Sequence, residues 1–421
     1  MSEALAEAPY PERLSARGFI ARIAWRNLWR NPRRTWLTAG AIAFASLLVS
    51  ASMSLQAGSY KTMVATATGL LYGQIQIIHP RYEDDQKLEY TLNHATETLR
   101  KLDALPGLVV APRVEAFALV SAEERSFGGL LSGVDFDREL QAVTFFRKIA
   151  QGRLPQADDE ILIGALMARN LNVRPGDEII FLGTAKEGGV AALAFTVAGI
   201  FQSGQAELDR TLSFARLSAV QNGFALGDEV HRFVISTQPE RVADDVKRIQ
   251  TVVDRSEDAW VRGWTEFLPD VVQAIELDRA MGRIMYGVLL LLVSFSVVNT
   301  FIMIVFERTR EFGMLLGIGM QPGLIVRQTM LEAVFVWAVG VIFGLTLSLA
   351  LVGYLAVSGL PVAGIQELAD TFYIEDRIYP AVTPASLLAA PLVLLMGTQL
   401  AALAASGRIY RLRAVQAVRA E

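Results

Sequence analysis

Four long stretches of this sequence carry no charged side chain. They lie between Arg34 and Lys61, Arg283 and Glu307, Glu332 and Glu367, and Arg377 and Arg408. Each is longer than the roughly 20 residues that a helix needs to cross about 30 Å of hydrocarbon. The chain is also 52% hydrophobic, which is high for an ordinary soluble protein. The sequence therefore predicts four transmembrane helices, at 35–58, 284–306, 333–357 and 384–406.

The charges outside these stretches predict the orientation. Residues 1–34 hold seven arginines and three glutamates, and the tail 407–421 is also basic, whereas the loop 358–383 is mainly acidic. Because cytoplasmic flanks are enriched in Lys and Arg, both termini are expected in the cytoplasm. The first apolar stretch is too long for the apolar region of a signal peptide, so it is expected to remain as an anchor.

Residues 59–283 have the composition of a soluble domain. Alternating apolar residues in "GQIQIIHP", "DEIIFLG", "LAFTVAGI" and "RFVIST" predict strands, and Val242, Val246, Ile249 and Val253 recur at helical spacing. No helix breaker follows Pro269, so a stalk continuous with the second membrane helix is expected. The predicted fold is an α-helical membrane protein with four transmembrane helices plus a large α+β extracytoplasmic domain inserted between helices 1 and 2.

Several kinds of chemistry have no signal in this sequence. There is no cysteine and no G-x-x-x-x-G-K-[ST] motif, so we expect no nucleotide site, and we assign no catalytic, cofactor-binding or metal residues. His79, His94 and His231 are scattered and are expected at the surface or in turns. No ionisable residue lies near the centre of a predicted membrane helix, which argues against proton-coupled transport. The chain is therefore predicted to be neither an enzyme nor a nucleic-acid-binding protein, and to depend on a partner for energy.

The segment before the first membrane helix combines arginine with tryptophan. Arg22, Arg26 and Arg30 are spaced by four residues, with Trp25 and Trp29 between them. This pattern predicts an interfacial helix that contacts membrane lipid through these five side chains. The residues could equally be a simple basic flank that fixes orientation, and the two interpretations are compatible.

The segment 307–332, which follows the second membrane helix, has a characteristic pattern. "ERTREFGMLLGIGM" and the residues after it resemble the permease segment shared by MacB, FtsX, LolC and LolE. The matching positions are Glu307, Arg308, Arg310, Glu311, Gly313, Ile318, Gly319, Arg327, Glu332, Gly340 and Gly344. "WRNLWRNPRRTWLT" near the amino terminus is similar to the entry segment of the same family, and the resemblance extends from about residue 19 to the end.

The resemblance implies an ABC transporter permease of the mechanotransmission type in the bacterial inner membrane. It implies two permease chains per complex, identical or different, and two copies of a separate ATPase, which would bind ATP and Mg. A periplasmic adaptor or a lipoprotein carrier is a further implied partner. The residues expected to couple to the ATPase are Glu307, Arg308, Arg310, Glu311, Gly313, Gly319, Pro322 and Arg327.

Within this segment we expect several local features. Glu307 with Arg310 and Arg308 with Glu311 are spaced for ion pairs on a helix. Pro322 is expected to begin a short coupling helix that ends near Gln328, and Glu332 to pair with a nearby arginine such as Arg327. The charges could instead be only a flank that stops translocation.

Two questions remain open at this point. Gly340 and Gly344 predict close helix packing, either within the subunit or against a second subunit. The function is expected to be release of a lipoprotein or lipid, or export of a hydrophobic substrate. The alternatives are an FtsX-like subunit that activates a periplasmic partner, and MacB-like efflux of a peptide or antibiotic through an adaptor.

Overall fold

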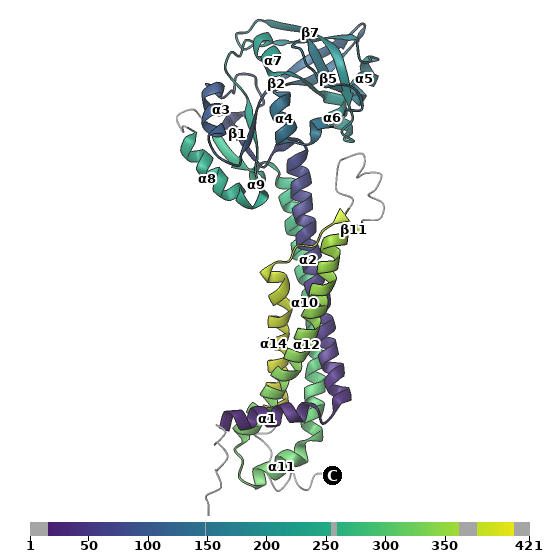
Figure 1. The fold of residues 1–421 in the computed structure, drawn as a ribbon, viewed down its shortest axis with the longest axis vertical. Helices are drawn as coiled ribbons and strands as arrows, with labels where there is room; N and C mark the ends of the chain where they lie inside the picture. The colour runs from purple at the N-terminus through teal and green to yellow at the C-terminus, as the bar shows by residue number, and fades with distance from the viewer. Residues whose placement is uncertain (1–15, 148, 254–258, 362–376, 408–421) are drawn as a thin grey trace, which may run out of the picture. The chain divides into compact units, whose positions relative to one another are not determined.

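The computed structural model describes residues 16–147, 149–253, 259–361 and 377–407. The chain forms two compact units, which we describe separately (Figure 1). Unit 1 consists of Met1–Ser59, Leu277–Leu360 and Ile378–Glu421, and unit 2 of Tyr60–Glu276 and Pro361–Arg377. Residues 1–15 of the predicted cytoplasmic segment, residues 362–376 of the predicted acidic loop and residues 408–421 of the predicted basic tail lie outside the described residues.

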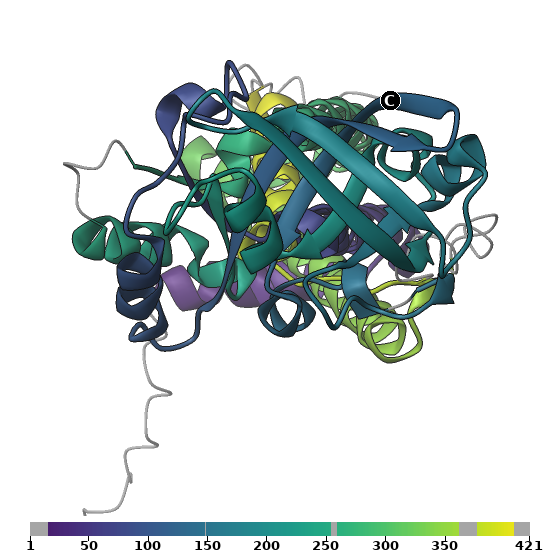
Figure 2. The ribbon, with the colours of Figure 1, turned by 90° about the horizontal axis from the view of Figure 1, so that it is seen from above.

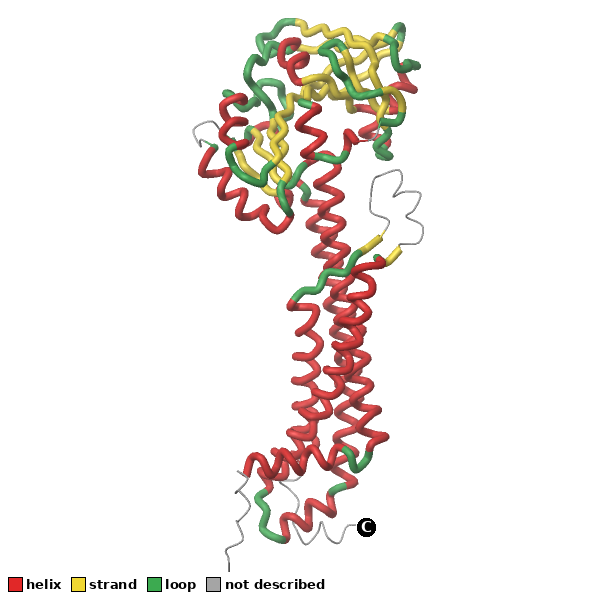
Figure 3. The backbone as a smooth tube through the Cα atoms, in the orientation of Figure 1, coloured by secondary structure: helices red, strands yellow, loops and turns green. Residues whose placement is uncertain are grey.

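Unit 1 is helical, and most of its helices are long (Figure 3). In chain order they are α1 (Ala16–Leu28), α2 (Pro32–Ala67), α10 (Pro269–Glu307), α11 (Thr309–Gly317), α12 (Pro322–Ser358) and α14 (Pro384–Ser406). The last residues of α2, after Ser59, and the first of α10, before Leu277, belong to unit 2. Among the described residues, four helices are long and apolar enough to cross a membrane: Pro32–Tyr72, Pro269–Glu307, Pro322–Ser358 and Pro384–Ser406. The four predicted apolar helices are therefore confirmed, and α10 is unbroken from Pro269 onward.

One predicted element of unit 1 is wrong. No separate helix ends near Gln328, because Pro322 begins α12 and this helix continues to Ser358. Proline is well suited to this first position, since its missing N–H would have no partner there. No proline or glycine between Leu324 and Val339 could stop the helix. The short helix of this region is instead α11, before the proline.

Glycines allow the helices of unit 1 to approach closely. A Cβ atom at Gly340 would lie 2.7 Å from the carbonyl oxygen of Ala39, and one at Gly344 would lie 2.5 Å from that of Ala43. Both contacts join α12 to α2 of the same chain. Of the two packing alternatives for these glycines, the structure shows packing within the subunit. The short strands β11 (Leu360–Pro361) and β12 (Arg377–Ile378) pair beyond α12.

Unit 2 is an α+β unit. Among the described residues, ten strands form one sheet in the order β10-β1-β9-β2-β3-β8-β5-β7-β4, with β6 paired to β2 and β7. The strands are β1 (Ile75–Ile78), β2 (Val109–Ala122), β3 (Arg125–Val134), β4 (Gln151–Gly152), β5 (Glu160–Gly164), β6 (Glu178–Thr184), β7 (Val190–Phe201), β8 (Leu212–Arg216), β9 (Arg232–Ser236) and β10 (Trp260–Gly263). Figure 2 shows the longer strands lying side by side.

Helices cover parts of this sheet. They are α3 (Ala95–Asp103), α4 (Phe136–Ala142), α5 (Ala165–Leu171), α6 (Ala206–Thr211), α7 (Leu217–Gly223), α8 (Val242–Val252) and α9 (Trp264–Phe267). Side chains alternate along the strands as the sequence predicts: Ile179 and Phe181 of β6 are buried, whereas Ile180 and Leu182 are exposed. A cluster of edge-to-face phenylalanines that includes Phe146 and Phe214 fills part of the core.

One histidine departs from its predicted place. His79 and His94 directly precede short helices, and both are at least partly exposed, as expected. His231 is instead fully buried. Its Nδ1 atom accepts the backbone N–H of Glu115 at 3.0 Å, and its Nε2 atom lies 3.2 Å from the carbonyl oxygen of Leu88. Because both ring nitrogens have backbone partners, burial costs the neutral ring little.

Candidate functional site

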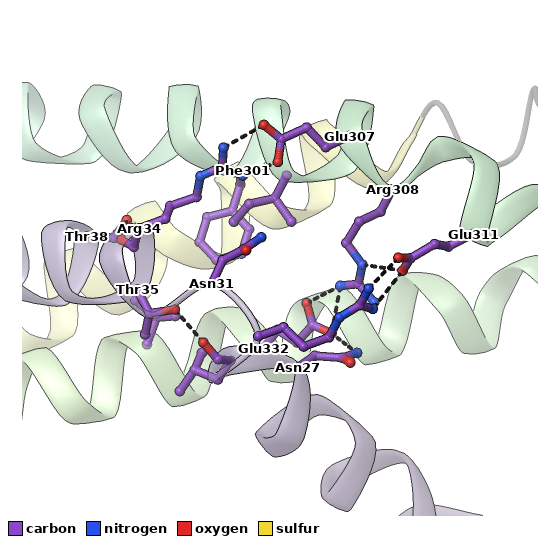
Figure 4. Close-up of a pocket in the computed structure, with 14 residues that line it drawn as sticks. Asn27, Asn31, Arg34, Thr35, Thr38, Phe301, Glu307, Arg308, Glu311 and Glu332 are labelled. Carbon is purple, nitrogen blue, oxygen red and sulfur yellow. Dashed lines mark hydrogen bonds and ion pairs between the residues drawn. The ribbon is translucent and has the colours of Figure 1, made fainter. Parts of the chain in front are cut away.

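A cluster of charged side chains lies at one end of unit 1, where α1, α2, α10, α11 and α12 meet. Figure 4 shows these side chains around a cavity of about 180 Å³. In Figure 1, α1 runs across the ends of the long helices at this point. The cavity is lined by Asn27, Leu28, Arg30, Asn31, Arg34, Thr35, Thr38, Phe301, Ile304, Glu307, Arg308, Glu311, Glu332 and Val336.

Arg308 is at the centre of the cluster. It is the single residue between α10 and α11, and its guanidinium contacts two carboxylates (Figure 4). Nη1 donates to the two oxygens of Glu332 at 3.1 and 2.9 Å, and Nε donates to Glu311 at 3.1 Å. The side chains of Arg308 and Glu332 are only 18% and 8% exposed. This ion pair is therefore mostly shielded from solvent.

Glu332 of α12 has further hydrogen-bond partners besides Arg308. In addition to Arg308, it accepts Nδ2 of Asn27 at 2.8 Å and Nε2 of Gln328 at 3.1 Å. Asn27 belongs to α1, and Gln328 lies one turn earlier in α12. The carboxylate thus fixes α1 and the start of α11 to α12, with its hydrogen-bonding capacity largely filled.

Two bidentate pairs complete the cluster. Arg30 donates to Glu311 at 3.1 and 2.8 Å, and Arg34 donates to Glu307 at 2.6 Å through each nitrogen. The hydrogen bond from Arg30, reinforced by Arg308, holds the pKa of Glu311 below its usual value. Such paired forks fix geometry as well as charge. The turn between α1 and α2 is thereby tied to the end of α10 and the start of α11.

The opposite side of α11 is free of these contacts. Phe312 and Gly313 are buried on the side of α11 that faces the protein. Arg310, Met314 and Ile318, the residue after the helix, are exposed on the outer side. Met314 is 51% exposed and Ile318 86%. We call Arg310, Met314 and Ile318 the α11 outer face. It combines one cation with two large apolar side chains, a composition suited to contact with another protein.

A glycine ends α11 and directs the chain into α12. Gly319 has φ +96°, a conformation that favours glycine. Its N–H donates to the carbonyl of Leu316, and the N–H of Met320 donates to that of Leu315. These bonds satisfy carbonyls at the helix end. The chain then reverses within a few residues to start α12 at Pro322.

The structure confirms one predicted ion pair of this segment and corrects two. Arg308 and Glu311 do pair. Glu307 pairs with Arg34 instead of Arg310, which forms no ion pair among the described residues. Glu332 pairs with Arg308 instead of Arg327, which is exposed and likewise has no ion pair in the described part of the chain.

The amino-terminal segment is a helix as predicted, and it departs from the predicted pattern at Arg30. Ile20, Ala24 and Leu28 are buried against the protein, and α1 ends at Leu28. Trp25 and Trp29 are exposed beside Arg22 and Arg26. Arg30 lies beyond the helix and pairs with Glu311, so it does not continue the predicted arginine row.

Sequence reasoning missed three members of the cluster. Asn27, Arg34 and Gln328 were not assigned a role, although each contributes a hydrogen bond or ion pair. Asn27 and Arg34 belong to "RNLWRNPRR", part of the segment that resembles the family's entry segment. That motif was the available signal, since a polar amide beside buried apolar residues needs a partner.

Two family models match this chain. The model described as MacB-like periplasmic core domain matches residues 35–252, and the model described as FtsX-like permease C-terminal matches residues 283–414. Together they account for most of both units.

Several curated proteins are similar to the chain. The lipoprotein-releasing system transmembrane protein LolC of Neisseria meningitidis serogroup B is 22% identical over 81% of this chain and 84% of its own length. LolC of Xylella fastidiosa (strain 9a5c) is 24% identical over 74% of this chain and 77% of its own length. The macrolide export ATP-binding/permease protein MacB of Bordetella avium is 24% identical over 82% of this chain and 54% of its own length.

Solved structures show weaker likeness. The periplasmic region of MacB from Actinobacillus actinomycetemcomitans is 14% identical, with a TM-score of 0.34, over 49% of this chain and 94% of that one. The extracellular domain of the transporter YknZ from Gram-positive bacteria is also 14% identical, with a TM-score of 0.33, over 45% of this chain and 99% of that one.

Proposed function

Because this chain belongs to the ABC transporter permeases of the MacB, FtsX and LolC family, we propose that it couples ATP hydrolysis by a separate ATPase to movement of its MacB-like domain. In this proposal the four apolar helices cross the bacterial inner membrane, both termini face the cytoplasm, and residues 59–283 lie in the periplasm. The ATPase would supply the nucleotide site, with ATP and Mg, because this sequence contains no G-x-x-x-x-G-K-[ST] motif.

The proposal rests on one observation: the α11 outer face is exposed, and ion pairs of Arg308 hold the helix that carries it. Arg310 and Met314 lie on a short helix, Ile318 directly follows it, and the other side of the helix is held by the Arg308 ion pairs. A force applied to this face would reach α10 through Arg308, which links the two helices, and α12 through the ion pair of Arg308 with Glu332. Such a rigid connection is what a docking element needs if it is to move membrane helices.

The coupling residues therefore have different roles in this proposal. Arg310, with Met314 and Ile318, would contact the ATPase. Glu307, Arg308 and Glu311 would instead position α11, since their side chains bind arginines and glutamates of this chain. Gly313, Gly319 and Pro322 would shape the segment, and Arg327, exposed on the first turns of α12, would flank the docking face.

The assembly would contain two permease chains and two ATPase copies. Purification of the complex with its ATPase would also show whether the second permease chain is identical to this one or different. Release of a lipoprotein or lipid is the favoured activity because the proteins named LolC match the chain over most of their own length. Export of another hydrophobic substrate is the alternative activity. The periplasmic partner would be a lipoprotein carrier for release or an adaptor for export.

The FtsX-like match at residues 283–414 also fits a second function, in which the periplasmic domain activates another protein. Reconstitution would separate the functions. Proteoliposomes that contain the complex, a lipoprotein and ATP should release the lipoprotein to a soluble carrier. ATP hydrolysis without release of lipoprotein or of a hydrophobic substrate would favour signalling.

A charge reversal tests the docking face. Arg310→Glu should abolish co-purification of the ATPase with the tagged full chain. Arg174→Glu is the control, because Arg174 is an exposed arginine of unit 2. Wild-type ATPase recovery and ATP hydrolysis in the Arg310→Glu complex would overturn the proposed docking face.

A further inference from the structure

Three arginines near the amino terminus have no acidic partner among the residues that the structure describes. Arg22, Arg26 and Arg33 are exposed, and none of them forms a side-chain hydrogen bond or ion pair with another described residue. Their neighbours Arg30 and Arg34 are both paired with glutamates. The charge cluster at the end of unit 1 therefore uses two arginines and leaves three available to an external anion.

A continuous row of aromatic rings lies beside these arginines. Edge-to-face contacts join Phe335 to Trp25 at 5.4 Å, Trp25 to Trp29 at 5.9 Å, Trp29 to Trp36 at 6.1 Å, and Trp36 to Phe343 at 5.7 Å between ring centroids. The three tryptophans are exposed. We call Trp25, Trp29, Trp36, Phe335 and Phe343 the aromatic row. Exposed tryptophans of this kind are typical of the membrane–water interface.

The apolar side of α1 is not available to lipid. Its residues Ile20, Ala24 and Leu28 are buried in the protein. The side that α1 presents outward carries Arg22, Trp25, Arg26 and Trp29, at the spacing i, i+3, i+4 and i+7 of one helix face. An outward face of guanidinium and indole groups is suited to head groups rather than to the hydrocarbon interior.

Large apolar side chains are also exposed near the aromatic row, on α2 and α12. Leu37 and Phe44 of α2 and Leu347 of α12 are exposed there. Along α2, the surface thus passes from arginine to tryptophan to aliphatic and aromatic side chains. A phospholipid has the same order, from phosphate to glycerol to acyl chain.

We propose that Arg22, Arg26 and Arg33, together with the aromatic row, form a binding site for anionic phospholipid. The guanidinium groups bind the phosphate, and the indoles pack at the level of the glycerol backbone. The proposal rests on the membrane location of the four apolar helices and does not require ATPase docking at α11.

Lipid bound at this site would act on the charge cluster. Asn27 of α1 donates to Glu332, and Arg30, which follows α1, donates to Glu311. A head group that holds α1 in place therefore also holds the two carboxylates that position α11. The content of anionic lipid in the membrane would thereby set how firmly the α11 outer face is presented.

Fluorescence quenching by brominated lipid measures this binding directly. The detergent-solubilised full chain is titrated with brominated phosphatidylglycerol or brominated phosphatidylcholine, and tryptophan emission is followed. Half-maximal quenching of the tryptophan emission should require a lower concentration of brominated phosphatidylglycerol than of brominated phosphatidylcholine. Replacing Arg22, Arg26 and Arg33 by Gln should raise that concentration about fivefold for each arginine removed, because each basic residue near an anionic surface contributes about 1 kcal/mol.

The matched control is Arg100→Gln with Arg169→Gln and Arg174→Gln, which removes three exposed arginines from unit 2. This control should keep the wild-type preference. Equal half-saturation by the two lipids in the wild-type chain would overturn the proposal, as would an unchanged preference in the Arg22, Arg26 and Arg33 variant.

A salt titration of the wild-type chain keeps the test decisive if the triple variant does not fold. The preference for phosphatidylglycerol should weaken as ionic strength rises, since the contacts are electrostatic and exposed. A preference that is independent of salt would contradict the arginine site. Arg310→Glu should retain the lipid preference, so failure of ATPase docking and failure of lipid binding give different results.

Discussion

Nη1 of Arg308 lies 2.9 Å from Oε2 of Glu332, and this contact joins the end of α10 to α12 across 24 positions of sequence. The pair is mostly shielded from solvent, and Asn27 and Gln328 donate to the same carboxylate. One glutamate therefore connects α1, α12 and the link between α10 and α11. Replacing Glu332 by a neutral residue should therefore loosen α1, α12 and this link together.

We expect Glu332→Gln and Arg308→Gln each to destabilise the protein by about 3 kcal/mol, because each leaves a shielded charge without its partner. The double variant should cost less than the sum of the two. Thermal unfolding of the full chain in detergent measures both effects. Arg327→Gln is the control and should change stability by less than about 0.5 kcal/mol. Additive effects of Arg308→Gln and Glu332→Gln would show that the two side chains do not interact.

Packing of α12 against α2 predicts a sharp difference between two glycines of the same helix. A Cβ atom at Gly344 would lie 2.5 Å from a backbone oxygen and 2.8 Å from Cβ of Ser46, whereas one at Gly353 would meet nothing within 4 Å. Gly344→Ala should therefore destabilise by about 1 to 3 kcal/mol, and Gly353→Ala should not. Equal melting temperatures for the two variants would contradict this packing.

The turn that ends α11 offers a second glycine pair. Gly319 has φ +96°, whereas Gly317 closes the helix and has no positive φ. Gly319→Ala should cost about 1 to 2 kcal/mol because a side chain strains this conformation. Gly317→Ala should be neutral or slightly stabilising. Since a strained turn also displaces the α11 outer face, we expect weaker recovery of the ATPase for Gly319→Ala alone.

Burial of His231 predicts how the stability of unit 2 depends on pH. Removal from solvent lowers the pKa of His231 from 6.5 to about 4. The unfolded chain therefore binds a proton below about pH 6.5 while the folded chain does not, so the free energy of unfolding decreases as pH falls from there toward 4. The contribution of His231 between about pH 7 and about pH 5 is a loss of about 2 kcal/mol.

His231→Gln isolates that contribution, since glutamine does not titrate. The full-chain variant should lose less stability than wild type between the two pH values, as measured by thermal unfolding. Glu115, Tyr82 and Arg232 surround the ring and are unchanged in the variant. The same loss in wild type and variant would assign the acid sensitivity to other groups.

Parts of this structure follow from the sequence because the signal is local. The four apolar helices could be predicted from the absence of charge, and β6 and β7 from alternation of apolar residues. The start of a helix at Pro322 could also be predicted. The predicted end of that helix near Gln328 is wrong, because no proline or glycine interrupts the helix there.

Contacts between distant segments could not be predicted in this way. Arg34 and Glu307 are 273 positions apart, so no spacing rule relates them. Arg327 was the obvious candidate for Glu332 by proximity, but residues five apart on a helix point about 140° away from each other. The correct partner, Arg308, comes from the link before α11, and only the tertiary fold brings it there.

The central claim is that the α11 outer face binds the ATPase, and single-cysteine cross-linking tests it most directly. The chain has no cysteine, so Ile318→Cys introduces a unique thiol on this face. The control is Val357→Cys, near the other end of α12, where the side chain is equally exposed. A short thiol-to-amine reagent should link Ile318→Cys to the co-purified ATPase and leave Val357→Cys unlinked. An assembled, ATP-hydrolysing complex in which neither Ile318→Cys nor Met314→Cys forms that link would contradict the account.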